Sequence, residues 1–480
     1  MNTTTSSRSD PSSTPVWQPR AAAVHAGVAR CDITPPTGIY ARMWGAAEHD
    51  CAEGVHQPLT ATVLAIRGND GGEPLLLISL DWVFVTGEEE LSLLRTPLLE
   101  LLGGDPARLI IACTHTHAAG MMTLSRSNLP GGALIAPYLQ HTAEQLRRAS
   151  EQALQSSQTQ PCTLTWSTGR CDLAANRDLP AADGLRDLCG FNPAAKVDDT
   201  LLVGRLTRQA DDSMLATVVN YACHPTTLAW ENRLLSPDYV GTMREVVESA
   251  TGGAPCLFLQ GASGELAPRL QYVADLAIAE GHGRQLGHAV LSTLAGMLPP
   301  RRKLVMEQVV ESGAPLAVWG TAADEPSDAV SAICFQVDLP TKPMPTVEQL
   351  CAKLAGCTDR AQSERLRRQL RLVEQFRMNK AFACSVWAWR IGDALFVAQP
   401  NEAYSDLQQC LRSAFPQQAV LVMNVANGSC GYLYPRHLAG RNRYAVWQSP
   451  YTGEALDVLV NECQRHLTNL VVGPDASTRY

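Results

Sequence analysis

The chain has 480 residues, of which 45% are hydrophobic and 18% are charged, and its formal net charge is −8. A chain of this length and composition can bury a large core, and its mild negative charge argues against nucleic acid or an anionic membrane surface as the main partner. No apolar run approaches the roughly 18 residues that a membrane-spanning helix requires, so we expect no stable membrane association.

The N-terminal segment 1–20 is rich in Ser, Thr and Pro and contains no long apolar stretch. This composition predicts disorder over 1–20 and is not that of a secretory signal. No internal repeat or clear linker divides residues 21–480, which we interpret as a single domain. The 15 cysteines are scattered and form no C-x-x-C pair, a pattern typical of free thiols in a reducing compartment, and we expect a cytoplasmic protein.

Short apolar runs alternate with amphipathic ones, which indicates an α/β fold. The runs predict strands at 75–85, 108–113, 214–223, 255–260, 394–399 and 419–426, and helices at 137–155, 283–298 and 453–470. Residues 345–378 are strongly charged and place leucines at helical spacing, with arginines interleaved among Glu and Asp. We interpret them as a helical hairpin inserted at the surface and not as a nucleic-acid site, because no patch of one sign forms.

Five of the predicted strands are followed directly by polar or glycine-rich turns. The turns begin with Thr-His-Thr-His at 114–117, His-Pro-Thr at 224–226, Gly-Ala-Ser-Gly-Glu at 261–265, Pro-Asn-Glu at 400–402 and Asn-Gly at 427–428. Ligands of open α/β sheets bind outside the carboxyl ends of strands. We therefore expect the five strand ends to converge on one site.

The residue types at these turns suit a metal. His115 and His117 lie two residues apart and point the same way on an extended chain. With Glu402 they supply two imidazoles and a carboxylate, a pattern of catalytic zinc sites, where the metal activates water and polarises a carbonyl. Each residue also has a structural interpretation, since His224 could cap a turn and Glu402 could lie at the surface or near a helix N-terminus.

The ordered motifs along the chain resemble the catalytic domain of the neutral (non-lysosomal) ceramidases and their bacterial relatives. The resemblance starts near residue 26, covers nearly all of the remaining chain, and implies layered mixed sheets flanked by helices. The motifs that carry it are GVARCDITPPTG (27–38), GVHQPLTA (54–61), THTH (114–117), ANRDLP (175–180), NYACHPT (220–226), SPDYVG (236–241), LQGASGELAP (259–268), QPNEAY (399–404) and ANGSCGY (426–432).

This resemblance implies one Zn²⁺ per chain, held by His115, His224, Glu402 and a tyrosine. Tyr432 is the candidate tyrosine, while the second tyrosine that the family has in this region aligns with Ser429. His117 would face the substrate and move protons. Arg177 would hold the substrate carbonyl or a neighbouring oxygen, a role that suits its permanently charged fork of donors.

One departure from the family concerns the nucleophile. The ceramidases carry a serine just before the proline of GASGELAP, and this chain has Ala267 there. Ser263 is a weaker candidate because it occupies a different place in the turn. We therefore expect metal-activated water to attack, with His117 as the first choice of general base and Asp238 and Glu265 behind it.

The carboxylate of Asp81 is expected to contact a metal ligand and not the metal itself. Asp81 falls within an apolar strand prediction, so it needs a partner, and it could accept a hydrogen bond from a zinc-bound histidine.

Taken together, these patterns predict a zinc-dependent amidohydrolase acting on a small or amphipathic amide. An esterase or lactonase on the same site and a catalytically inactive metal- or ligand-binding homologue are the alternatives. Only about 50 residues follow Tyr432, and they predict a loop and one helix in place of the C-terminal immunoglobulin-like domain of the ceramidases. Oligomeric state stays open, a homo-oligomer included.

Overall fold

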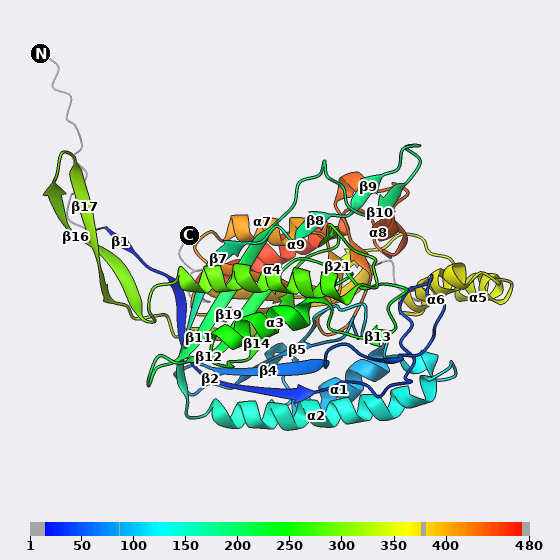
Figure 1. The fold of residues 1–480 in the computed structure, drawn as a ribbon, viewed down its shortest axis with the longest axis horizontal. Helices are drawn as coiled ribbons and strands as arrows, with labels where there is room; N and C mark the ends of the chain where they lie inside the picture. Colours follow the sequence, from blue (N-terminus) through cyan, green and yellow to red (C-terminus); the bar gives the residue numbers. More distant parts are fainter. Residues whose placement is uncertain (1–14, 86, 376–380, 473–480) are drawn as a thin grey trace, which may run out of the picture.

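A computed structural model of the protein describes residues 15–85, 87–375 and 381–472 (Figure 1). Its centre is an eight-stranded sheet with the strand order β14-β12-β11-β7-β2-β4-β5-β6. The strands are β2 (Arg20–Asp32), β4 (Thr60–Arg67), β5 (Leu75–Leu80), β6 (Leu109–Cys113), β7 (Pro161–Arg170), β11 (Thr200–Arg208), β12 (Met214–Tyr221) and β14 (Cys256–Gln260). The sheet is mixed, because the β5–β6 and β12–β14 pairs are parallel and the others antiparallel.

A second sheet of four strands packs against the first. Its order is β18 (Val330–Pro340), β19 (Ala381–Ile391), β20 (Ala394–Ala398) and β22 (Ala419–Met423). Apolar side chains from both sheets share one core cluster, in which the rings of Trp166 and Phe396 lie 5.7 Å apart edge to face. Successive side chains of a β-strand point to opposite faces of the sheet. In β4, Leu64 and Ile66 therefore face the second sheet, while Val63 and Ala65 face the helices.

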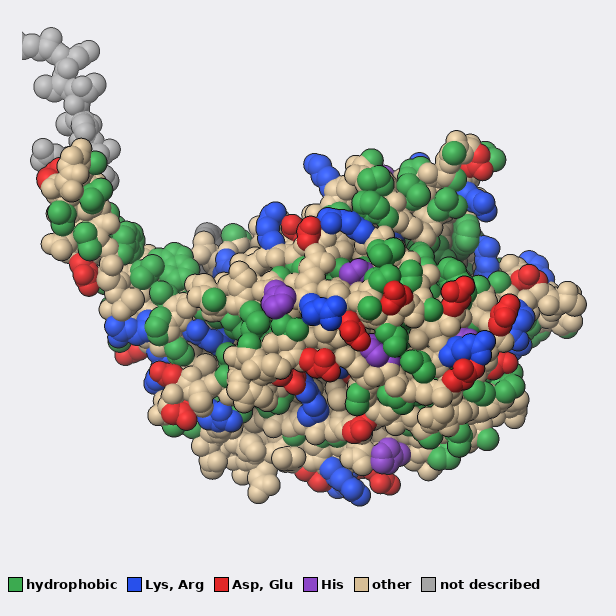
Figure 2. Space-filling view, in the orientation of Figure 1, with side chains coloured by type: hydrophobic (Ala, Val, Ile, Leu, Met, Phe, Trp, Pro, Cys, Tyr) green, Lys and Arg blue, Asp and Glu red, His purple; other side chains and the backbone are tan. Residues whose placement is uncertain are grey.

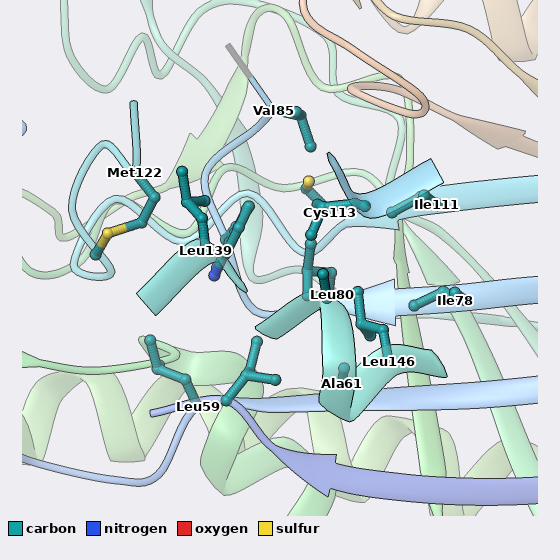
Figure 3. Packing of buried hydrophobic residues seen from close by; sticks show 14 of the residues in the cluster. Leu59, Ala61, Ile78, Leu80, Val85, Ile111, Cys113, Met122, Leu139 and Leu146 are labelled. Atoms are coloured by element: carbon teal, nitrogen blue, oxygen red, sulfur yellow. The ribbon is translucent and has the colours of Figure 1, made fainter. Parts of the chain in front are cut away.

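Helices cover the two outer faces, so the domain has four layers. The large sheet is covered by α1 (Glu88–Leu101), α2 (Ile135–Ser156), α3 (Tyr239–Ala250) and α4 (Leu276–Ala295), and the small sheet by α7 (Asp406–Ala414) and α9 (Ala455–Val472). Figure 3 shows part of the core under α2, where Leu139 and Leu146 lie in one cluster with Ile78 and Leu80 of β5. The structure confirms the layered mixed-sheet α/β fold.

The predicted elements are found at their expected places, with shifted ends. The largest differences are at 283–298, where α4 begins earlier, at Leu276, and at 75–85, where β5 ends at Leu80 and residues 81–83 form a bend. Asp81 therefore lies at the end of the strand and not within it. In the segment predicted to be disordered, Val16–Trp17 forms β1 and pairs with β16, while residues 1–14 lie outside the described residues.

A three-stranded arm projects from one end of the domain (Figure 1). It consists of β1, β16 (Arg302–Glu311) and β17 (Pro315–Ala323). Figure 2 shows hydrophobic side chains along it, and Trp17, Val309 and Trp319 are exposed. Within the described ranges, none of the helices combines the length and the hydrophobicity that a membrane span needs.

The charged region 345–378 contains α5 (Val347–Ala355) and α6 (Arg360–Gln375), which pack against each other at the opposite end from the arm (Figure 1). A capping box between Thr346 and Gln349 starts α5. Residues 376–378 of the predicted hairpin lie outside the described residues. Leu366 and Val373, which share one face of α6, are 5% and 7% exposed, and Glu364 is buried as well.

Candidate metal centre

Strand ends from both sheets meet at one buried cluster. His115 follows β6 and His224 follows β12 of the large sheet, while Glu402 follows β20 of the small sheet in the short strand β21 (Glu402–Ala403). Glu402 pairs directly with Tyr432, the first residue of β23 (Tyr432–Leu433). The fold thus brings together four side chains, of which the first, His115, and the last, Tyr432, are nearly 320 positions apart in the sequence.

The cluster has the dimensions of a metal site. Oε2 of Glu402 lies 3.3 Å from Nε2 of His115 and 3.2 Å from Nε2 of His224. Nε2 of His117 lies 3.5 Å from Nε2 of His115, and one ligand atom from each of the three imidazoles can be chosen so that all lie within 4.8 Å of one another. His115, His117 and His224 therefore form a group that could hold a metal ion, and Glu402 adds an oxygen donor beside it.

Backbone carbonyls fix the orientation of two of the imidazoles. Nδ1 of His115 lies 2.6 Å from the carbonyl oxygen of Val83, and Nδ1 of His224 lies 2.8 Å from that of Ser263. A carbonyl only accepts hydrogen bonds, so both Nδ1 atoms carry the proton and both Nε2 atoms present lone pairs to the cluster. This is the arrangement that metal-bound histidines have in proteins.

The electrostatics keep the donors in their ligand forms. Burial, together with the charge of Arg177, lowers the pKa of His224 to about 3. Burial and the two neighbouring imidazoles also hold the pKa of His117 well below its ordinary value. Burial alone would raise the pKa of Glu402, but the adjacent rings of His115 and His224 hold it well below the usual range. At neutral pH the cluster therefore offers neutral imidazoles at His117 and His224 and an ionised carboxylate at Glu402.

Arg177 lies against the cluster, as does Tyr432. Nη2 of Arg177 lies 3.1 Å from Nε2 of His224 and donates to the Tyr432 hydroxyl at 3.0 Å and to the Gly264 carbonyl at 2.8 Å. Burial and the charge of Glu402 raise the pKa of Tyr432 well above its ordinary value, so its hydroxyl stays protonated. Both side chains therefore present hydrogen-bond donors at the edge of the candidate metal site.

The backbone at His115 differs from the extended conformation expected. Its φ is +70°, in the left-handed region that residues with a Cβ rarely adopt, and β6 has already ended at Cys113. The argument that His115 and His117 point the same way on an extended chain is therefore wrong. The left-handed turn brings their rings together instead, with centroids 4.9 Å apart, and strain of this kind is common at functional sites.

Aromatic rings that the sequence analysis did not identify line the side of the cluster at His117. The ring of Trp44 lies 5.4 Å from that of His117, and Trp230 and Tyr272 pack against Trp44 at 6.2 and 5.6 Å. All three are partly exposed. A tryptophan in a loop gives no pattern from which this role could be read, because the contact depends on how the loop folds.

The expected role of Asp81 as acceptor for a metal-bound histidine is wrong. Its carboxylate is paired with Arg244, at 2.9 and 2.6 Å, and accepts a hydrogen bond from the Thr114 hydroxyl at 3.1 Å. The acceptor for His115 is the Val83 carbonyl. Asp81 acts on the site through Thr114, the residue before His115.

The other predicted base candidates have partners away from the imidazoles. Asp238 begins α3 and accepts from the backbone N–H of Leu228 and of Tyr239. Glu265 accepts from the backbone N–H and hydroxyl of Ser405. The structure brings His115, His117, His224, Arg177, Glu402 and Tyr432 together and directs these two carboxylates elsewhere.

Neither of the two positions considered for a nucleophilic serine, 267 and 263, directs a hydroxyl at the histidine cluster. Ala267 is fully buried and pairs with Ala175 in a short antiparallel ladder. The Ser263 hydroxyl accepts from the side chain of Gln260 at 2.6 Å, and it is the Ser263 carbonyl that touches His224. Ser263 therefore contributes a backbone acceptor to the centre.

Helix α6 packs beside the cluster, and the charge of its Arg368 acts on His117. Arg368 donates to the Met43 carbonyl on one side and to the Tyr444 hydroxyl, at 3.1 Å, on the other. The ring of Tyr444 in turn lies 5.7 Å from that of Tyr432. The sequence predicted that the charged side chains of this helix face water, and it indicated no role for the arginines at the site.

The fold and the cluster define an α/β protein with a buried histidine–carboxylate centre of metal-binding type. No protein-family model and no curated protein matches the sequence. Among solved structures, the chain is similar to neutral ceramidase from Pseudomonas aeruginosa, with a TM-score of 0.65 and 15% identity over 94% of this chain and 74% of that one. It is also similar to a ceramidase complexed with C2, with a TM-score of 0.63 and 14% identity over 94% and 75%. The chain thus has the fold of the neutral ceramidases, as its motifs predicted.

Proposed function

We propose that the protein is a zinc-dependent hydrolase that cleaves an amide bond in a small or amphipathic molecule. The observation that carries the proposal is the convergence of the Nε2 atoms of His115 and His224 on one oxygen of Glu402. Nitrogen and oxygen donors in this combination suit zinc. The ceramidase fold supports the choice of an amide substrate.

The tautomers of His115 and His224 and the burial of the donor atoms support the fit of this donor set to a metal. Two lone pairs and a carboxylate oxygen face one another away from water, and the Nδ1–H groups that fix them are bonded to carbonyls. His115, His224 and Glu402 would hold the ion, with Tyr432 beside them. When bound, zinc polarises a substrate carbonyl and lowers the pKa of water at the site.

His117 is the residue that moves the proton. It is neutral because burial and its neighbours hold its pKa low, so its free nitrogen can accept a proton from water. The same imidazole can then protonate the leaving amine. The contact of its ring with Trp44, which packs against Trp230 and Tyr272, supports a position facing the substrate.

Arg177 binds and orients the reacting carbonyl. Its guanidinium is anchored to the Gly264 carbonyl through Nε and Nη2, at 3.2 and 2.8 Å, so its charge is held in place before substrate arrives. A preorganised charge of this kind stabilises the oxyanion that forms as the carbonyl is attacked. No serine hydroxyl is in position at Ala267 or Ser263, so we assign the attack to water.

Zinc content and turnover measured on the same variants test the proposal. We expect wild-type protein to contain one zinc, and His224→Ala and Glu402→Gln to lose it together with hydrolysis of a panel of amides and esters. His117→Asn should keep the zinc and lose activity about 100-fold or more, the usual contribution of a general base. His141→Ala, an exposed histidine on α2, is the matched control.

The same variants separate the two ligand sets that the cluster allows. If His117→Asn loses zinc and Glu402→Gln keeps it, the three imidazoles are the ligands and His117 is not the proton carrier. Protein that contains no stoichiometric metal, and an active His224→Ala variant, would refute the proposal. Preference for esters over amides would favour an esterase or lactonase on the same site, and metal without turnover would favour a binding protein.

The cytoplasmic location is also part of this proposal. All 15 cysteines are free thiols, the state that a reducing compartment maintains.

A further inference from the structure

A cavity of about 880 Å³ lies next to the metal centre, under α6. Its walls come from α6, the beginning of α1, residues 121–126 and residues 427–430. Among the described residues that line it, none belongs to the metal cluster, because Phe84 lies between: its ring centroid is 6.1 Å from that of His115. The cavity is therefore a neighbouring compartment.

Arg371 is the unusual residue of this cavity. Its guanidinium carbon lies 4.9 Å from the centroid of the Phe84 ring, and its Nε and Nη1 are shielded from solvent without a hydrogen-bond partner. Burial and the charge of Arg368 lower the pKa of Arg371 to about 10, so it remains charged at neutral pH. A buried charge with unpaired donors is unfavourable and therefore rare, and it marks a place where a ligand anion would bind strongly.

Five other charged side chains that line the cavity have protein partners. Arg126 and Arg368 both bond to Glu364, and Arg95 bonds to Glu88. The Glu90 carboxylate accepts from the hydroxyl of Thr123 and the backbone N–H of Leu124. Within the described part of the lining, Arg371 is the arginine whose buried donors remain unpaired.

The composition of the walls indicates the kind of anion. Glu364 neutralises part of the arginine charge among the described lining residues, and no salt bridge there joins Arg371 to a carboxylate, so a ligand with a single negative charge matches this cation better than a dianion. Apolar walls from Val85, Met121, Leu354, Leu370 and Trp387 offer contacts to hydrocarbon. A carboxylate presents oxygens in the plane that guanidinium N–H groups prefer.

We propose that this cavity binds a monocarboxylate with an apolar body, held by the guanidinium of Arg371. The carboxylate could come from two sources. It could be part of the substrate, or it could be a free acid, such as the acid released by amide hydrolysis; the first source rests on the proposed function, whereas binding of the free acid does not.

Binding of hexanoate to the full-length protein tests the proposal without any turnover. We expect isothermal titration calorimetry to show binding of hexanoate and none of hexan-1-ol at equal concentration. Arg371→Met should weaken hexanoate binding by about 10- to 100-fold, the loss expected for hydrogen bonds to a charged group. Arg367→Met, which changes an exposed arginine of the same helix and cavity, should weaken it by less than about threefold.

Thermal stability of the same variants separates a binding role from a structural one. Because its donors are unpaired, Arg371→Met should unfold at the same temperature as the wild type or higher, and hexanoate should raise the unfolding temperature of the wild type alone. A large loss of stability in Arg371→Met, equal binding by the variant, or equal binding of hexan-1-ol would overturn the proposal.

Inhibition kinetics then identify the source. If hexanoate competes with a carboxylate-bearing amide, and Arg371→Met raises KM for that amide but not for its neutral analogue, the carboxylate belongs to the substrate. If hexanoate binds with the same affinity when the carboxylate-bearing amide is saturating, and Arg371→Met leaves the KM of that amide unchanged, the cavity takes a free acid. Should no hydrolysis be found at all, the calorimetric result still stands, so failure of the two proposals can be told apart.

Discussion

Replacing Arg244 with Met removes the cation from a carboxylate that has no access to water. The side chains of Asp81 and Arg244 are 0% and 6% exposed, and two contacts of 2.9 and 2.6 Å join them. Asp81 also accepts from the backbone N–H of Thr60 at 2.8 Å and from the hydroxyl of Thr114 at 3.1 Å. These bonds hold the carboxylate in place, so in Arg244→Met it stays buried with its charge uncompensated.

The expected cost is about 3–5 kcal/mol, the usual result of removing one partner from a buried ion pair. The double variant Asp81→Asn/Arg244→Met removes the charge as well and should recover most of that loss. Arg233→Met is the control: Arg233 pairs with Glu53 at the surface, where both side chains are about half exposed, and its loss should cost less than about 1 kcal/mol. Urea denaturation of the wild type, Arg244→Met, Asp81→Asn and the double variant gives the coupling energy of the pair.

The same substitution has a functional readout because Thr114 immediately precedes His115. A displaced Thr114 should shift the left-handed turn at His115, and we expect zinc affinity to fall about 10- to 100-fold, the usual effect of disturbing groups that orient metal ligands. A loss of stability below about 1 kcal/mol, with unchanged zinc affinity, would refute the view that this ion pair positions the centre.

Two further substitutions test the turn that follows β14. In Gly264→Ala the new Cβ would lie 2.5 Å from Cδ1 of Tyr404 and 3.1 Å from the carbonyl oxygen of Glu402, so zinc affinity, measured against a chelating dye, should fall about tenfold or more; an unchanged affinity would contradict the geometry. Burial raises the pKa of Glu265 to about 8, so the folded state binds more protons than the unfolded state between about pH 4.5 and 8. Stability should therefore fall by up to about 1.4 kcal/mol per pH unit as the pH rises through this window, and Glu265→Gln should remove most of that slope. A wild-type urea midpoint that is flat across the window would show the carboxyl to be ionised in the fold.

The convergence of the strand ends could be predicted from sequence, because apolar runs and the polar turns after them are local features. The allocation of these strands to two sheets could not, since the pairing of β20 with β22 and of β6 with β5 depends on contacts far apart in the chain. The partner of Asp81 was missed for the same reason. Arg244 lies 163 positions away on α3, and no spacing rule connects them.

Helix α6 shows a different limit of sequence reasoning. Its mixture of Arg and Glu with leucines at helical spacing is typical of a helix with one solvated face. That pattern identifies the apolar face but cannot show which polar residues another part of the protein covers. Arg368 and Arg371 reach the site and its neighbouring cavity because the helix packs beside them, and only the tertiary structure reveals this.

The side chains of the centre are held largely by backbone atoms, which explains how such a site can tolerate extensive change in sequence. Carbonyl oxygens of Val83, Ser263 and Gly264 orient His115, His224 and Arg177. Any residue can supply a carbonyl, so the side chains at these positions can vary while the ligands keep their geometry; Gly264 is the exception, because the space at its Cβ is taken. The side chain of Ala267 makes no contact of this kind, so a different residue there would leave the three carbonyl contacts in place.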